Sequence, residues 1–133
     1  MLYTYNLVIS LSLQGWDLLE LQSPDFVLAA SLPELGIDSI KAKVDTVALT
    51  SAIHATEIQF STVDGKYWVD FTVPTSQFSD ALTVRCRAPL VGYRKVRNSG
   101  GVQDERAVIA TKVAIGDQLR TIELPLAPRT NMR

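Results

Sequence analysis

A tight Asp-Gly turn between two β-rich runs is the feature that most constrains the fold of this chain. Asp64-Gly65 separates residues 57–63 from residues 67–73, and both runs are rich in β-branched and aromatic residues. Glycine adopts a positive φ at no steric cost, so Asp-Gly between such runs is among the strongest short-range signals for a β-hairpin. The sequence therefore predicts an antiparallel hairpin at this point.

Further β-rich segments follow along the chain. Apolar alternation and short apolar runs predict strands over residues 7–13, 26–32, 40–44 and 82–88, and a second hairpin that joins residues 108–115 to residues 118–126 through Gly116-Asp117. Pro89 is expected to end the strand before it or to place that strand at a sheet edge. About seven short strands, without an amphipathic helix longer than about two turns, predict an all-β fold, either a β-barrel or a β-sandwich.

Length and composition set the class of protein. With 133 residues, of which 47% are hydrophobic and 20% charged, the chain is expected to form a single globular domain over residues 1–133. A net charge of −1 excludes bulk electrostatic attraction to nucleic acid. No run reaches the roughly 20 apolar residues of a membrane helix, and the first basic residue is Lys41, so a secretory signal is not expected. We expect a cytoplasmic protein with no membrane and no nucleic-acid partner.

The chain has a single cysteine, Cys86, and a single histidine, His54. An intramolecular disulfide is therefore impossible, and a zinc site typically needs three or four protein ligands. A Gly-x-Ser-x-Gly nucleophile elbow is absent from the sequence. We expect no metal and no cofactor, with Cys86 as a buried, inert thiol and His54 as a hydrogen-bonded structural residue.

Charge is distributed unevenly. Residues 1–40 contain acids but no Lys or Arg, whereas residues 81–103 contain cations but no acid. The cations are Arg85, Arg87, Arg94, Lys95 and Arg97. Two interpretations remain open: these are solvated charges on strand faces, or they form an uncompensated basic surface that binds an acidic partner or substrate.

The stretch from Ile40 to Ala55 is the strongest candidate for a functional site. An apolar strand delivers Asp45 and Thr46, and a run of small and hydroxyl-bearing residues follows. Judged from these residues alone, Asp45 could simply cap a turn by accepting backbone N–H groups. The segments around it favour a second interpretation.

Several segments, in the same order, resemble the bacterial retropepsin-like aspartic protease family, which is also labelled "ATP-dependent zinc protease" and is associated with modification of ribosomal protein S6. They are Leu32–Ile37, Lys41–Ala48, Thr50–Ala55, Trp68–Val73, Cys86–Pro89, Arg94–Gly100, Glu105–Ile109 and Asn131–Arg133. The resemblance covers residues 26–133 and leaves residues 1–25 as an atypical N-terminal segment. It implies a small, closed or partly open, acid-protease-like β-barrel of a single lobe.

The resemblance also implies a reaction. Asp45 matches the catalytic aspartate, and Thr46 matches the threonine that typically locks the two active-site loops together by hydrogen bonds. Aspartic proteases need two carboxylates that share one proton. The sequence contains one Asp-Thr pair, so the second aspartate must come from a symmetric partner, which implies a homodimer.

Substrate is expected to contact the residues after the catalytic pair and the basic segment. These residues are Val47, Ala48, Arg94, Arg97 and Ser99. The Gly-containing loop at residues 98–101 is expected to act as a flap. Because Arg binds carboxylates through paired hydrogen bonds, a peptide or protein with an acidic tail is the expected substrate.

The sequence also departs from the family pattern. Val47 stands where the family has glycine, Leu49 stands where it usually has a basic residue, and the sequence ends at Arg133, just short of an apolar-apolar-Gly segment. A β-branched side chain at position 47 is expected to crowd the loop that holds substrate and water. We therefore expect weak or absent activity. Two other hypotheses are a catalytically inactive β-barrel binding or regulatory module, and a β-barrel interaction protein in which Asp45 only caps a turn.

Overall fold

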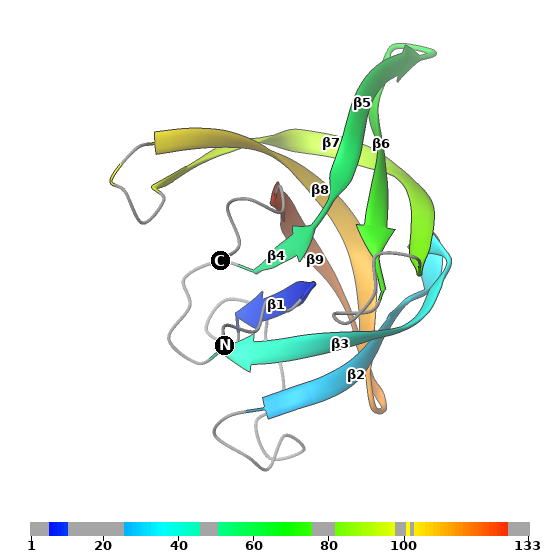
Figure 1. Cartoon of the computed structure of the whole chain (residues 1–133). Coiled ribbons are helices and arrows are strands. Elements are labelled where there is room, and N and C mark those ends of the chain that lie inside the picture. The colour runs from blue at the N-terminus through cyan, green and yellow to red at the C-terminus, as the bar shows by residue number, and fades with distance from the viewer. Residues whose placement is uncertain are drawn as a thin grey trace.

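The computed structural model describes residues 6–10, 26–45, 51–75, 82–97, 101 and 103–127. Its strands are β1 (Leu7–Ser10), β2 (Phe26–Leu32), β3 (Ile37–Asp45), β4 (Ala52–His54), β5 (Thr56–Val63), β6 (Lys66–Pro74), β7 (Thr83–Arg97), β8 (Gln103–Ile115) and β9 (Gln118–Ala127) (Figure 1). A short 3-10 helix, η1 (Pro33–Leu35), joins β2 to β3. Across these residues no helix is long and apolar enough to cross a membrane.

The strands form a closed barrel with an extension. Hydrogen-bonded neighbours follow the order β2-β3-β1-β4-β9-β8, and β2 also pairs with β8 through Ser31 and Ala114, which closes the ring. From β8 the sheet continues outward through β7 and β6 to β5, which lies at its edge. We call β5, β6 and β7 the extension, and Figure 1 shows its β5–β6 hairpin projecting beyond the barrel. The predicted all-β barrel is confirmed.

Alternation of buried and exposed side chains explains why these segments are strands. On β3, Ile40 and Ala42 are buried while Lys41 and Lys43 are exposed. On β6 the same period of two buries Phe71 completely. Fully burying a large apolar side chain contributes about 1.5–3 kcal/mol. The apolar face of each strand therefore fixes which side of the sheet faces the core.

Both predicted hairpins are confirmed. Asp64 and Gly65, between β5 and β6, have φ values of 51° and 78°, as a type I′ turn requires. Gly116, between β8 and β9, has a φ of 57°. Glycine adopts this positive φ at no steric cost, as the first central position of a two-residue hairpin loop requires.

Strand β7 is longer than the predicted strand over residues 82–88, and Pro89 does not end it. The strand pairs with β6 from Thr83 to Pro89 and with β8 from Leu90 to Arg97. A register shift lies between Leu90 and Gly92. Pro89 therefore lies where the strand exchanges one partner for the other, next to an irregularity of the kind that tolerates a residue without an N–H.

Candidate functional site

Asp45 is the last residue of β3. The strand is held on both sides at this end, because Val44 is paired with Phe26 of β2 and Asp45 with Ser10 of β1. The strand was predicted over residues 40–44, and it extends one residue further, so that Asp45 is still part of the ladder. Thr46, Val47 and Ala48 follow directly but lie outside the described residues, as does Ser99.

Strand β1 is the neighbour of Asp45 that sequence reasoning missed. It runs parallel to β3 and antiparallel to β4, and so lies between β3, which carries Asp45, and β4. Leu7 and Ile9 of β1 are fully buried. The apolar alternation predicted a strand here, but its partners are set by tertiary packing, which the local pattern does not record.

A buried hydrogen-bonded pair ties the start of β1 to β4. The His54 N–H donates to the backbone oxygen of Asn6 at 2.7 Å, and His54 Nδ1 lies 3.0 Å from Asn6 Oδ1. Since an amide oxygen only accepts, His54 donates from Nδ1 as well. His54 is 2% exposed, and the prediction that it is a structural residue is confirmed.

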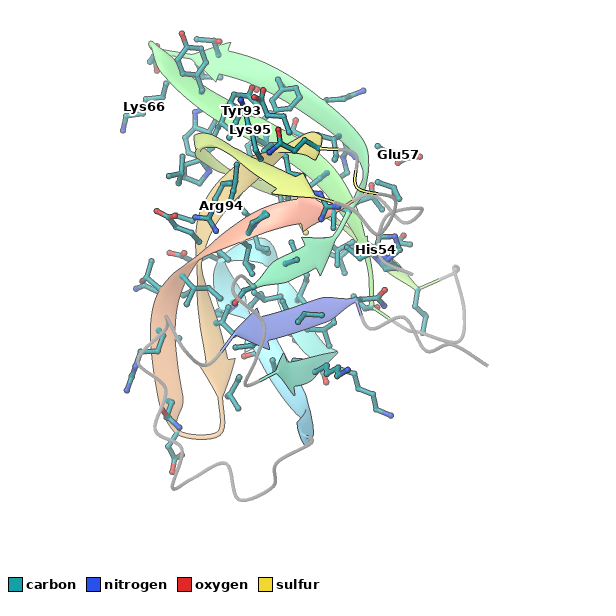
Figure 2. All side chains as sticks on the ribbon, turned by 90° about the vertical axis from the view of Figure 1, so that its left-hand side faces the viewer. His54, Glu57, Lys66, Tyr93, Arg94 and Lys95 are labelled. Carbon is teal, nitrogen blue, oxygen red and sulfur yellow. The ribbon has the colours of Figure 1, made fainter. Side chains whose placement is uncertain are left out.

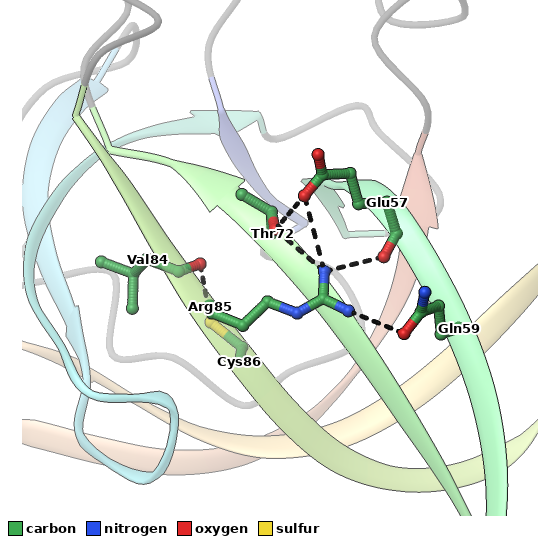
Figure 3. Close-up of polar contacts among 6 residues, drawn as sticks. All are labelled: Glu57, Gln59, Thr72, Val84, Arg85 and Cys86. Atoms are coloured by element: carbon green, nitrogen blue, oxygen red, sulfur yellow. Dashed lines mark hydrogen bonds and ion pairs between the residues drawn. The ribbon is translucent and has the colours of Figure 1, made fainter.

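The cations of residues 81–103 are largely matched by acids from other strands. Arg85 lies on β7, and its Nη1 donates to the backbone oxygen of Glu57 at 2.8 Å and to Thr72 Oγ1 at 2.9 Å (Figure 3). Its Nη1 also lies 3.9 Å from Glu57 Oε2, and its Nη2 donates to Gln59 Oε1 at 3.3 Å. Glu57 has a positive φ of 52° at an irregularity of β5. Arg85 therefore binds together the three strands of the extension at a strained point.

Arg87 and Arg94 also have acidic partners. Arg87 donates from Nε and Nη2 to the two carboxylate oxygens of Asp70 at 2.6 and 3.1 Å. This hydrogen bond lowers the pKa of Asp70 and raises the pKa of Arg87. Arg94 Nη2 lies 3.3 Å from Glu123 Oε1 of β9.

Of the two interpretations left open, an uncompensated basic surface is therefore wrong for Arg85, Arg87 and Arg94. The sheet brings acids that are distant in sequence next to them. Lys95 is exposed and lies opposite Glu105 across the β7–β8 pair. Arg97 is the last residue of β7.

The ends of the relevant strands lie on one side of the barrel. Figure 1 shows the end of β3, the end of β7 and the start of β8 toward the left of the view. Figure 2 looks onto that side and places Arg94 and Lys95 there. The candidate catalytic residue and the candidate substrate-binding arginines therefore come from strands that end on the same face.

Cys86 takes no part in this site. It is 4% exposed, and its Sγ lies 3.6 Å from the backbone oxygen of Leu35. Burial raises the pKa of the thiol to about 11, so the reactive thiolate is suppressed at neutral pH. The predicted buried thiol is confirmed. In the part of the chain that the structure describes, no three His, Cys, Asp or Glu side chains are grouped so that they could hold a metal ion.

A small closed barrel in which one strand ends on the aspartate of an Asp-Thr sequence pair defines the class of single-lobe, acid-protease-like domains. The family model described as "Retropepsin-like aspartic endopeptidase RimB" matches residues 28–133. The chain therefore belongs to the RimB-like family of retropepsin-like domains. Strand β1 precedes the matched residues.

Curated relatives are larger proteins. A "Probable alpha-L-glutamate ligase" of Desulfotalea psychrophila is 42% identical over 102 residues, which cover 77% of this chain and 22% of the ligase. A protein of the same description from Shewanella pealeana is 36% identical over the same shares of both chains. This chain thus spans about a fifth of the length of these relatives.

A solved structure is also similar. The crystal structure of a Legionella pneumophila protein with unknown function (DUF785) has a TM-score of 0.65 and 27% identity. The match covers 79% of this chain and 73% of that protein. It supports the barrel architecture independently of the family model.

Proposed function

We propose that this chain is half of an aspartic endopeptidase site, completed by a second copy of itself. The observation that carries the proposal is the position of Asp45 at the end of β3 in a RimB-like barrel. The sequence supplies one Asp-Thr pair. Two copies related by a two-fold axis would supply the second aspartate from the same position.

The chemistry follows from two adjacent carboxylates. Repulsion between like charges separates their pKa values, so that one carboxylate is ionised while the other keeps its proton. The ionised Asp45 takes a proton from water, and the protonated Asp45 of the partner polarises the scissile carbonyl. Pairing of β3 with β2 and β1 up to its last residues supports this role, because it fixes the main chain at Asp45.

We propose an acidic polypeptide as the substrate. The curated relatives named as glutamate ligases contain a segment similar to this chain, and a ligase that adds glutamate produces the acidic chain that such a peptidase would trim. Arg94 and Lys95 offer cations on the side where β3 ends (Figure 2). Arg94 would exchange Glu123 for a substrate carboxylate.

The second candidate function is a binding or regulatory module without catalysis. Val47 favours it, because the family has glycine at this position. A β-branched residue next to the catalytic pair would keep substrate and water away from Asp45. Such a module would retain the dimer and the acidic ligand but not hydrolysis.

Mixing two variants tests whether each chain supplies half of a site. The Val47→Gly chain, chosen to relieve crowding of the loop, is mixed with an equal amount of the Val47→Gly, Asp45→Asn double variant until subunits exchange. Half of the active chains then pair with an inactive partner, so cleavage per active chain should fall to about half, and to about one tenth at ninefold excess. Cleavage that does not respond to the added chain would mean that one chain carries a whole site.

A further inference from the structure

A pocket lies on the extension, away from Asp45. Its volume is about 360 Å³. We call it the aromatic pocket, and it is lined mainly by Phe60, Ser61, Tyr67, Trp68, Leu90 and Tyr93. These residues come from β5, β6 and the middle of β7. The extension alone therefore forms this pocket, and the strands of the closed ring contribute no lining residue.

The aromatic side chains of this pocket are unusually exposed. Phe60, Tyr67 and Tyr93 are 55%, 64% and 56% exposed. The ring centroids of Phe60 and Tyr93 lie 6.3 Å apart, which joins β5 to β7 across the pocket. Exposed aromatic groups around a concavity mark surfaces that bind another molecule.

Backbone and hydroxyl groups beside the pocket are available for hydrogen bonds. Strand β5 is at the edge of the sheet, and an edge strand presents N–H and C=O groups that an added strand can pair with. Ser61 Oγ is buried and has no hydrogen-bond partner within the described residues. Buried hydroxyl groups are normally paired, so this one favours a polar ligand group at the pocket wall.

Exposed charges of both signs lie near the pocket, namely the cations Lys66 and Lys95 and the acids Asp64 and Glu105. Lys66 precedes Tyr67, and Lys95 follows Tyr93 by two residues on β7, and both lysines are exposed. Figure 2 labels Lys66, Tyr93 and Lys95 in the upper part of the molecule. The lining itself contains no charged residue. A ligand with an apolar side chain flanked by carboxylates would fit the lining and would pair with the two lysines.

We propose that the aromatic pocket is an exosite that binds an apolar side chain of an acidic polypeptide, extended along the edge of β5. The inference rests on the proposed function for the acidic nature of the polypeptide, but it places recognition outside the catalytic site. The pocket holds the substrate protein next to its acidic segment, while the segment itself reaches Asp45. Binding at the pocket requires no cleavage.

Peptide binding to the Asp45→Asn chain tests the exosite without hydrolysis. The probes are Glu-Glu-Glu-Phe-Glu-Glu-Glu and heptaglutamate, and the signal is the fluorescence of Trp68 in a Trp16→Phe background. The Phe-containing peptide should bind at least about tenfold more tightly, since a buried aromatic anchor carries much of an interface's binding energy. Phe60→Ser and Tyr93→Ser should each remove this preference.

Matched controls separate the pocket from general surface effects. Leu119 on β9 is 49% exposed, and Leu119→Ser should leave the preference intact. Changing Lys66 and Lys95 to Gln should weaken both peptides and reduce the dependence on salt. Circular dichroism checks that each variant is folded, and Tyr93→Phe, which keeps the ring, should retain the preference.

Equal affinity for the two peptides, or equal loss with Leu119→Ser, would overturn the exosite. The exosite would also be overturned if the Tyr93→Ser chain dissociated from dimer to monomer in sedimentation and still preferred the Phe peptide. That result would mean that a second copy of the chain, and not the peptide, occupies the pocket. Failure of the exosite leaves the mixing experiment unaffected. Conversely, failure of the mixing experiment leaves peptide binding unaffected, so the two proposals fail separately.

Discussion

Val47→Gly should raise kcat/KM for an acidic peptide by about tenfold to a hundredfold. Removing the β-branched side chain lets the backbone after Asp45-Thr46 approach substrate and water closely. A displacement of about 1 Å at a reacting group can cost about a hundredfold in rate, so relief of crowding should yield a gain of this order. The measurement is the initial rate of cleavage of a fluorogenic oligoglutamate peptide by each chain.

Two controls make this result specific. Val47→Ala keeps a Cβ but removes the branch, and its rate should fall between those of the unaltered and the glycine chains. Asp45→Asn in the Val47→Gly chain should reduce cleavage to the level without enzyme. If the unaltered chain cleaves peptides efficiently and Asp45→Asn does not slow it, both the crowding argument and the catalytic role of Asp45 are wrong.

Ile9→Ala should lower the free energy of unfolding by about 2–4 kcal/mol, the usual cost of deleting a large side chain from a packed core. Ile9 is completely buried in the core, with 0% of its surface accessible to solvent. It lies on β1, which pairs with β3 and β4 on either side. Urea denaturation followed by circular dichroism gives the change directly.

Val8→Ala is the matched control, because Val8 is the adjacent residue of β1 and is only half-buried. It should cost clearly less than Ile9→Ala, within roughly 1 kcal/mol. A negligible effect of Ile9→Ala would show that β1 is not part of the folded sheet. The expected loss of stability would instead show that β1 is packed into the sheet beside Asp45. This strand precedes the residues that match the family.

Local signals in the sequence were sufficient for the two hairpin turns and for the end of β3. The turns at Asp64-Gly65 and Gly116-Asp117 are each set by two adjacent residues, and the structure confirms both. The Asp-Thr pair after an apolar strand located Asp45 to within one residue of its position. Such features depend on neighbours in the sequence, which a pattern records well.

Features that depend on strand order could not be predicted. The acids that pair with Arg85, Arg87 and Arg94 lie 28, 17 and 29 residues away in the sequence. They become neighbours only because the sheet orders β5 to β9 as it does. The position of β1 between β3 and β4 has the same origin. A charge count along the sequence therefore overstated the basic surface.

The distance between the two Asp45 carboxylates in a crystal structure of the assembled protein would decide whether each chain supplies half of a catalytic site. The half-site account predicts a two-fold dimer in which these carboxylates approach to hydrogen-bonding distance, about 2.5–3.0 Å. Carboxylates on opposite sides of the assembly, or a monomer with Asp45 facing solvent alone, would contradict it.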